Sequence, residues 1–163
     1  DQVAHTGFAF INGAATAMAF AEYDEKWHLL AGFAGHCLVV DCASYEIVAT
    51  IEAFANGVQC IAVDGDFVLM SAPSPEPRVS VHRRRAVVGS ATNSFRFECQ
   101  GHLVHSSSPR EVEPAGDGRH CLTRTNDAGV MLWDFRSKVL VHRLPHTSFC
   151  HGFCARPFVV ADG

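Results

Sequence analysis

The sequence predicts an all-β protein, and three observations support this fold class. Apolar runs of four to seven residues recur along the chain and are separated by Gly, Pro, Asn, Asp and Ser. No stretch of twelve residues keeps the i, i+3, i+4, i+7 apolar pattern and the two caps that mark an amphipathic helix. Short strands at regular spacing, with turn residues between them, are typical of antiparallel β proteins.

The strands can be placed in order along the chain. Seven are expected in its first half, at residues 15–21, 28–33, 37–42, 47–54, 58–63, 67–72 and 79–82, and four more follow at 121–125, 130–135, 139–144 and 158–161. Asp64-Gly65 and the turn at Asp127 offer residues that tolerate a positive φ. Pro73, Pro75 and Pro77 remove backbone donors, so the segment that holds them is a loop.

The composition is that of a folded domain without a membrane span. The chain has 163 residues, of which 48% are hydrophobic and 18% charged. This length suffices to bury a core, and the hydrophobic fraction is close to the globular average. The longest apolar run, residues 14–21, is far shorter than the ~20 residues that a spanning helix needs. We expect no membrane insertion.

The charge distribution argues against a nucleic-acid partner. The net charge is −4, and residues 1–80 hold ten acidic but only two basic residues. Domains that bind nucleic acid usually carry a dominant basic face. The one dense basic run, Arg83-Arg84-Arg85, is interpreted as a solvated loop, because such short runs are weak evidence for a phosphate contact.

A repeat of four strands is clearest in residues 101–146. It opens with Gly101-His102, turns at Asp127 and closes with Trp133-Asp134, and His102 and Trp133 are 31 residues apart. Asp127 lies six residues before Trp133. This unit resembles a WD repeat, the four-stranded blade of one family of β-propellers.

Two earlier units resemble the same repeat in degraded form. Val40-Asp41 occupies the Trp-Asp slot of the first unit, and His82-Arg83 occupies that of the second. Asp41, Arg83 and Asp134 are separated by 42 and 51 residues, against a repeat of ~40–45. The longer gap predicts an insertion, at residues 89–94 or 105–109. The resemblance therefore implies a partial β-propeller of four-stranded antiparallel blades, with about three blades plus part of a fourth.

The expected organisation is a single propeller-like domain. Its blades are placed near residues 12–54, 55–100 and 101–146, with an incomplete one at 147–163. Propellers close with ~4–8 blades, because an open array leaves unpaired strand edges. We therefore expect this chain to be part of a longer propeller protein.

The resemblance also implies a hydrogen-bonded network within the third unit. Its members are His102, Thr123, Asp127 and Trp133. A buried carboxylate needs donors, and a histidine and a threonine can supply them. We interpret the set as structural, because no oxyanion hole or exposed nucleophile accompanies it. The sequence thus predicts no catalytic residue, no cofactor and no enzyme.

The function predicted from the repeats is a non-catalytic scaffold whose partners are other proteins. One alternative comes from Trp133-Asp134-Phe135-Arg136, which is similar to the Trp-Asp-x-Arg box of WD-repeat substrate receptors of cullin–RING ubiquitin ligases. In that alternative Asp134 and Arg136 would contact the adaptor. Cys121 and Arg124 depart from the family pattern before the turn.

A second alternative is a zinc-binding module. Two histidines and two cysteines follow one another at a spacing of four, His142, His146, Cys150 and Cys154. This spacing suits one face of a helix, and the residue types suit Zn²⁺. Pro145 and Gly152 oppose a helix there, so the main expectation is that no metal is bound.

The cysteines predict the compartment. The chain has seven, an odd number, and most lie beside Val, Ile, Leu or Phe. No secretory signal precedes them in this sequence, so they are interpreted as reduced, packed thiols. We expect an intracellular protein, cytoplasmic or nuclear.

Overall fold

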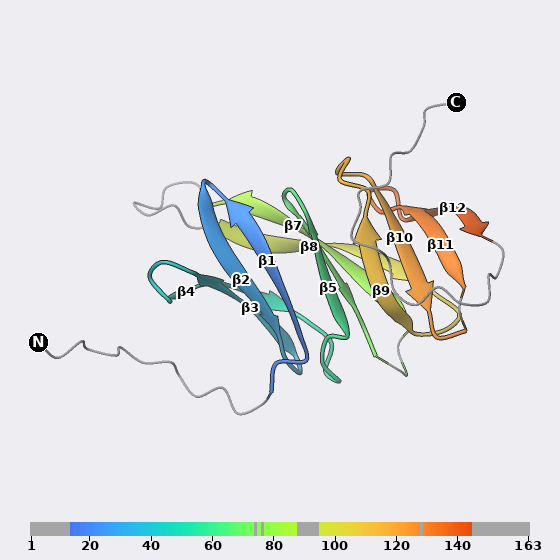
Figure 1. Ribbon diagram of the computed structural model, residues 1–163, viewed down its shortest axis with the longest axis horizontal. Coiled ribbons are helices and arrows are strands. Elements are labelled where there is room, and N and C mark those ends of the chain that lie inside the picture. Colours follow the sequence, from blue (N-terminus) through green and yellow to red (C-terminus); the bar gives the residue numbers. More distant parts are fainter. Residues whose placement is uncertain (1–13, 74, 76, 88–94, 128, 145–163) are drawn as a thin grey trace, which may run out of the picture.

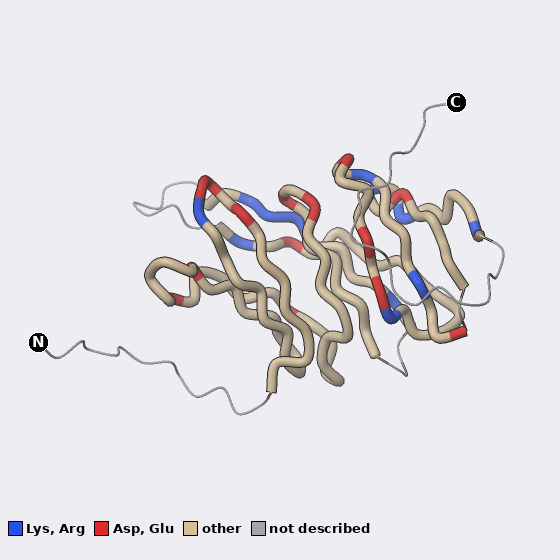
Figure 2. The backbone as a smooth tube through the Cα atoms, in the orientation of Figure 1, with Lys and Arg blue, Asp and Glu red and all other residues tan. Residues whose placement is uncertain are grey.

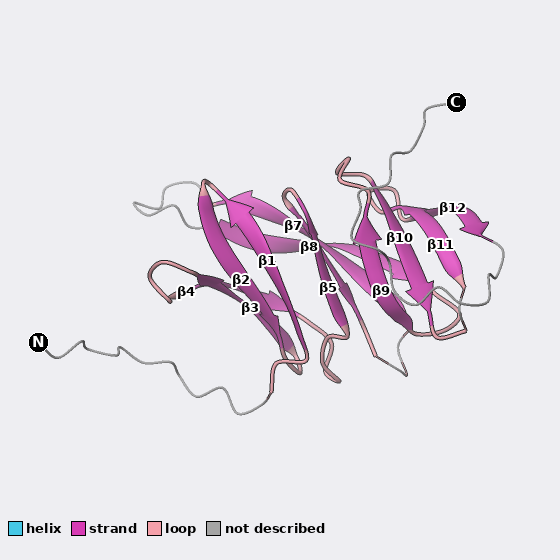
Figure 3. Cartoon of the chain, in the orientation of Figure 1, coloured by secondary structure: helices cyan, strands magenta, loops and turns pink. Residues whose placement is uncertain are grey.

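The computed structural model describes residues 14–73, 75, 77–87, 95–127 and 129–144. These residues form twelve strands, and the described part of the chain contains no helix (Figure 3). The all-β prediction is confirmed. Accordingly, no described helix has the length and apolar character needed to cross a membrane.

The strands form three four-stranded antiparallel sheets, each made of four consecutive strands (Figure 1). The first sheet holds β1 (Ala17–Tyr23), β2 (Lys26–Gly32), β3 (His36–Asp41) and β4 (Ile47–Glu52). The second holds β5 (Cys60–Asp64), β6 (Phe67–Ser71), β7 (Arg78–Ala86) and β8 (Phe95–Val104). The third holds β9 (Pro109–Pro114), β10 (His120–Thr125), β11 (Val130–Asp134) and β12 (Val139–Leu144).

The sheets are stacked so that their first strands lie together. β1 contacts β5, and β5 contacts β9. One apolar core lies between the first and second sheets and a second core between the second and third. Within β6, Val68 and Met70 belong to the first core and Leu69 to the second. This strand is buried throughout because the middle sheet is covered on both faces.

Two of the observed strands, β8 and β9, are not predicted from the sequence. β8 mixes buried and exposed positions without a clean alternation, since its register with β7 shifts at a bulge between Val81 and His82. β9 begins and ends with proline, which argues against a central strand. Proline is tolerated here because β9 is an edge strand that pairs only with β10.

The position of β8 changes the boundary between the second and third units. Gly101-His102 lies inside β8, so the third sheet begins after Val104 rather than at residue 101. The other expected strands of the three units match the sheets observed. The strand expected at 158–161 and the incomplete unit at 147–163 lie outside the described residues.

The basic run Arg83-Arg84-Arg85 lies in strand β7, not in a solvated loop. Arg84 donates to Asp24 of the β1–β2 hairpin and to Asp66 of the β5–β6 hairpin, at 2.7 and 2.9 Å. Figure 2 shows acidic and basic residues mixed at this end of the sheets. The local sequence does not reveal this arrangement, because the two acidic partners of Arg84 lie in two different hairpins.

Candidate functional site

A directed chain of hydrogen bonds crosses the third sheet. Trp133 Nε1–H donates to Thr123 Oγ1 at 3.0 Å, and the Thr123 hydroxyl donates to His105 Nε2 at 2.8 Å. His105 Nδ1–H donates to the carbonyl of Leu103 at 3.0 Å, which assigns the proton of the ring because a carbonyl only accepts. Burial lowers the pKa of His105 and so favours this neutral form.

This network differs from the expected one at two positions. The expected histidine, His102, lies on β8 opposite Ser80, whereas His105 follows the end of that strand and reaches Thr123. Asp127 lies in the β10–β11 turn, where a hydrogen bond from the Thr125 hydroxyl lowers the pKa of its carboxyl. The structure thus joins Trp133 directly to Thr123, and the histidine that Thr123 contacts is His105 rather than His102.

Asp134, one of the two expected partner contacts, is enclosed by its own turn. One carboxylate oxygen accepts the N–H groups of Arg136 and Ser137, both at 3.0 Å. The other accepts from Arg119 Nε at 2.8 Å. Burial alone would raise the pKa of Asp134, but the bonds from Ser137 and Arg119 lower it to about 2.

Arg136, the second expected contact, lies exposed beside this turn. Its Nε–H donates to the carbonyl of Gly118 at 2.6 Å, and its guanidinium lies 5.1 Å from the centre of the Phe67 ring. The Arg136 side chain therefore connects the third sheet to the second and is also exposed to solvent.

The alternative zinc set falls mostly outside the described residues. Only His142 is described, and it is exposed on β12. His146, Cys150 and Cys154 lie beyond Leu144. In the part of the chain that the structure describes, no three His, Cys, Asp or Glu side chains are grouped so that they could hold a metal ion.

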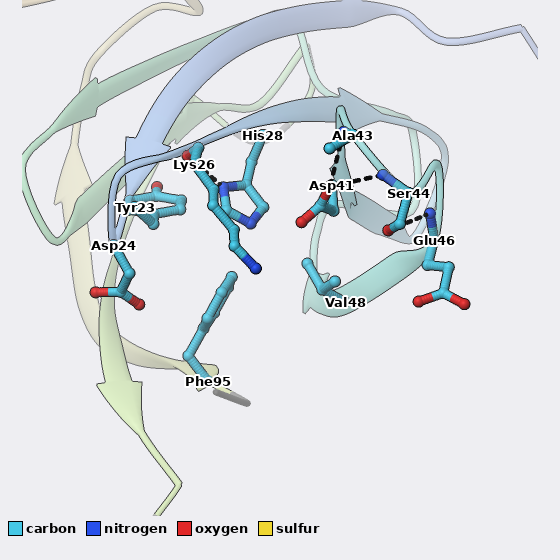
Figure 4. A pocket seen from close by; sticks show the side chains of 10 residues that line it. All are labelled: Tyr23, Asp24, Lys26, His28, Asp41, Ala43, Ser44, Glu46, Val48 and Phe95. Carbon is cyan, nitrogen blue, oxygen red and sulfur yellow. Dashed lines mark hydrogen bonds between the residues drawn. The ribbon is translucent and has the colours of Figure 1, made fainter. Parts of the chain in front are cut away.

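A cavity of about 340 Å³ lies where the β1–β2 hairpin meets the second sheet (Figure 4). Its lining combines three aromatic rings with several charged groups: Tyr23, Asp24, Lys26, His28, Asp41, Ala43, Ser44, Glu46, Val48 and Phe95. The rings of Tyr23, His28 and Phe95 pack with centroids 5.4 to 5.6 Å apart. All three side chains are buried.

Two polar groups face this cavity from the first sheet. His28 Nδ1–H donates to the carbonyl of Lys26 at 2.9 Å, and Figure 4 shows the other ring nitrogen directed into the space. One oxygen of Asp41 accepts from Ala43 and Ser44, at 2.7 and 2.9 Å. The other oxygen points back across the cavity in Figure 4. The bond from the Ser44 N–H, followed by that from the Ala43 N–H, is the largest cause that lowers the pKa of the Asp41 carboxyl.

The sequence analysis did not find this cavity. In the sequence, Asp41 is the second residue of the Trp-Asp slot of the first unit, and His28 begins the strand expected at residues 28–33. The one available signal is His28 itself, a titratable residue that begins an apolar strand. Phe95 comes from a strand that was not predicted.

No protein-family model and no curated protein matches the sequence. Solved structures do. The β-propeller domain of Cps50 (Swd1) from Myceliophteria thermophila matches with a TM-score of 0.67 and 16% identity, over 81% of this chain and 41% of that one. A chain in the mitotic checkpoint complex matches with a TM-score of 0.59 and 22% identity, over 78% of this chain and 38% of that one.

These neighbours are WD40 β-propeller proteins. This chain spans less than half the length of either. Its three sheets have the strand order of consecutive propeller blades, and their first strands lie together as propeller blades require. The described chain therefore has the fold of β-propeller blades, in agreement with the WD-repeat resemblance of its sequence.

Proposed function

We propose that this protein is a non-catalytic scaffold that binds other proteins. The observation that carries the proposal is the fold itself, which is shared with a propeller found in the mitotic checkpoint complex. Stacked blades hold their hairpins on a rigid frame, and exposed hairpin ends on rigid sheets suit the binding of partners. Fold alone does not assign a partner, so none is named.

The internal polar groups support a non-catalytic role. The hydroxyl of Thr123 is fully buried and is used by Trp133 and His105, so it offers no accessible nucleophile. Burial raises the pKa of the Cys37 and Cys121 thiols to about 12. A thiol with so high a pKa holds almost no thiolate at neutral pH, and the thiolate is the reactive form.

The scaffold proposal is tested by isolating the natural protein from its source cells after chemical crosslinking. We expect a defined protein partner, which then re-forms a complex of fixed stoichiometry with the purified protein in sedimentation velocity. Turnover of a small molecule by the purified protein, with no partner that re-forms a complex, would overturn the proposal.

A substrate receptor of a cullin–RING ligase is a second candidate. The exposure of Arg136 at the β11–β12 turn favours it, whereas Asp134 has both carboxylate oxygens engaged within the chain. In this candidate Arg136 carries the adaptor contact. Arg136→Ala should then abolish adaptor binding in a pull-down while the far-ultraviolet circular dichroism spectrum stays the same. Unchanged adaptor binding would remove this candidate.

We also propose that the protein acts in the cytoplasm or nucleus. The five cysteines in the described ranges, Cys37, Cys42, Cys60, Cys99 and Cys121, are all free thiols. Free thiols persist in reducing compartments. Fluorescence microscopy of the tagged natural protein tests this placement, and a secreted product would contradict it.

A further inference from the structure

We propose that the cavity between the β1–β2 hairpin and the second sheet binds a basic side chain, lysine or arginine, of a partner protein. This inference rests on the proposed scaffold function and adds the chemistry by which a partner is recognised. Four features of the cavity support it: an acceptor on His28, an acceptor on Asp41, an aromatic floor and an excess of acidic groups.

The first feature is the free acceptor of His28. The side chain is 3% exposed, and its Nδ1–H is used by the carbonyl of Lys26. In the neutral ring Nε2 is then an acceptor only. Nε2 faces the cavity and has no hydrogen-bond partner within the described ranges (Figure 4). An acceptor that opens into a cavity without a protein partner can take an N–H group from a ligand.

The second feature is the carboxylate of Asp41. Its turn-facing oxygen is held by two backbone N–H groups, which fixes the direction of the other oxygen toward His28. Two acceptors thus approach one space from β2 and from the end of β3. A ligand with several N–H groups and a positive charge satisfies both, and an anionic ligand would be repelled.

The third feature is the aromatic floor. The rings of Tyr23 and Phe95 already hold one cation, because the Arg84 guanidinium lies 4.8 and 5.4 Å from their centres. Cations bind favourably over aromatic faces, and more so away from water. The Tyr23 hydroxyl is buried and lacks a hydrogen-bond partner among the described residues. The ring pair is therefore suited to a positively charged neighbour.

The fourth feature is the charge and size of the cavity. Asp24, Asp41 and Glu46 line it together with a single cationic residue, Lys26, whose side chain extends toward Phe95 in Figure 4. Asp24 is already paired with Arg84, and Figure 4 shows the Glu46 carboxylate directed away from His28, so Asp41 is the carboxylate that faces a ligand. A volume of about 340 Å³ is at the lower end of the range for ligand cavities, which suits one side chain better than a cofactor.

The test uses the purified protein and two blocked amino acids as probes, N-acetyl-lysine methylamide and N-acetyl-arginine methylamide. We expect saturable chemical shift changes at the His28 ring and at the Ala43 and Ser44 amides, with a Kd on the order of 1 mM for probes of this size. The tighter probe tells whether an ammonium or a guanidinium is preferred. N-acetyl-norleucine methylamide, which is neutral, should cause no saturable change.

A pair of matched variants tests the role of Asp41. Asp41→Asn keeps an oxygen for the two turn N–H groups but removes the charge, and we expect the affinity for the basic probes to fall about tenfold or more. Asp117→Asn is the control, because Asp117 accepts N–H groups from the residues two and three positions further on in the same way, outside the cavity. It should leave probe affinity unchanged.

The outcomes separate this inference from the scaffold proposal. Saturable binding of a basic probe, lost in Asp41→Asn and kept in Asp117→Asn, supports the inference. Absence of saturable binding, equal binding of the norleucine probe, or an Asp41→Asn variant with unchanged affinity would overturn it. The scaffold proposal depends instead on the recovered partner, so a partner that binds while the probes do not contradicts the cavity alone.

Discussion

Thr123 on β10 connects β11 and the segment between β8 and β9 through one buried hydroxyl. The hydroxyl accepts from Trp133 on β11 and donates to His105, which follows β8. Removal of the oxygen leaves an indole N–H and an imidazole nitrogen without partners in a low-dielectric interior. Such groups cost more than an ordinary hydrogen bond contributes, because each has lost its water without gaining a replacement.

Thr123→Val should therefore lower the free energy of unfolding by at least about 2 kcal/mol, since each unsatisfied group costs ~1–3 kcal/mol. The variant keeps the shape of the side chain, so the loss reports the hydroxyl. Urea denaturation measures it. Thr50→Val is the control, because Thr50 is exposed on β4 and its replacement should change stability by no more than about 0.5 kcal/mol. Equal effects of the two changes would contradict the network.

His82 is a buried residue that remains neutral at physiological pH. Burial, followed by the nearby His102, lowers the pKa of His82 from 6.5 to about 4. Its Nε2 atom is buried and without a hydrogen-bond partner among the described residues. Between pH 6.5 and 4 the unfolded chain binds a proton at this site that the folded chain does not, so stability is lost as the pH falls through this range.

We expect this histidine to contribute about 3 kcal/mol to the loss of stability between pH 6.5 and 4. His82→Phe removes the titrating group and should make the pH dependence shallower in that range. Urea denaturation at several pH values measures the difference between the two proteins, which cancels the common contribution of the carboxylates. Parallel curves for the two proteins would show that His82 does not behave as described.

The turns that join the third and fourth strands have the same geometry in the first and third sheets. Asp41 and Asp134 each accept two backbone N–H groups, from the residues two and three positions further on. The fourth residue after each aspartate has a positive φ of 60°, at Tyr45 and at Lys138. The aspartate of the repeat thus shapes the turn whether or not a tryptophan precedes it.

Tyr45→Gly should stabilise the first sheet by about 0.5–1 kcal/mol, because a left-handed conformation costs a non-glycine residue about 1 kcal/mol or more. The ring of Tyr45 is largely exposed, so little packing is lost. Thermal denaturation measures the gain. Tyr45→Ala removes the same ring but keeps the Cβ atom, and it should give no such gain. If both variants were stabilised equally, the gain would come from removal of the Tyr45 ring and not from the backbone conformation.

At the scale of the molecule, the first sheet is covered on one face only within the described residues. Its inner face packs against the second sheet through residues such as Leu30 and Val39. Met18, Phe20 and Trp27 lie on the other face, where they are 66%, 65% and 56% exposed. A sheet face with several exposed large apolar residues marks an interaction surface.

We expect the 163-residue chain to self-associate through this face at micromolar concentration. Phe20→Lys places a charge in the middle of the apolar surface and should shift sedimentation velocity profiles toward the monomer. Val104→Lys is the control, because Val104 is equally exposed but lies on β8. Association that is equally sensitive to both changes, or to neither, would contradict a role for this face.

Features that depend on residues close together in the chain could be predicted from the sequence, and features that depend on long-range contacts could not. Strands such as β6 and the β5–β6 hairpin at Gly65 were predictable, because strand patterns and turn residues act over a few positions. β8 and β9 were not, since a bulge and two prolines obscure patterns that only sheet pairing resolves. His105, and not His102, reaches Thr123 because β8 ends at Val104, directly before His105.

By itself the sequence determined that this protein is all-β, that its strands come in groups of four, and that Asp and Gly residues turn the chain between them. Those features depend on neighbouring residues in the chain. Only the tertiary structure decided which histidine meets Thr123 and that Phe95 closes a cavity beside His28 and Asp41. These side chains are separated by many residues, and they meet because the sheets stack face to face, which sequence spacing does not encode.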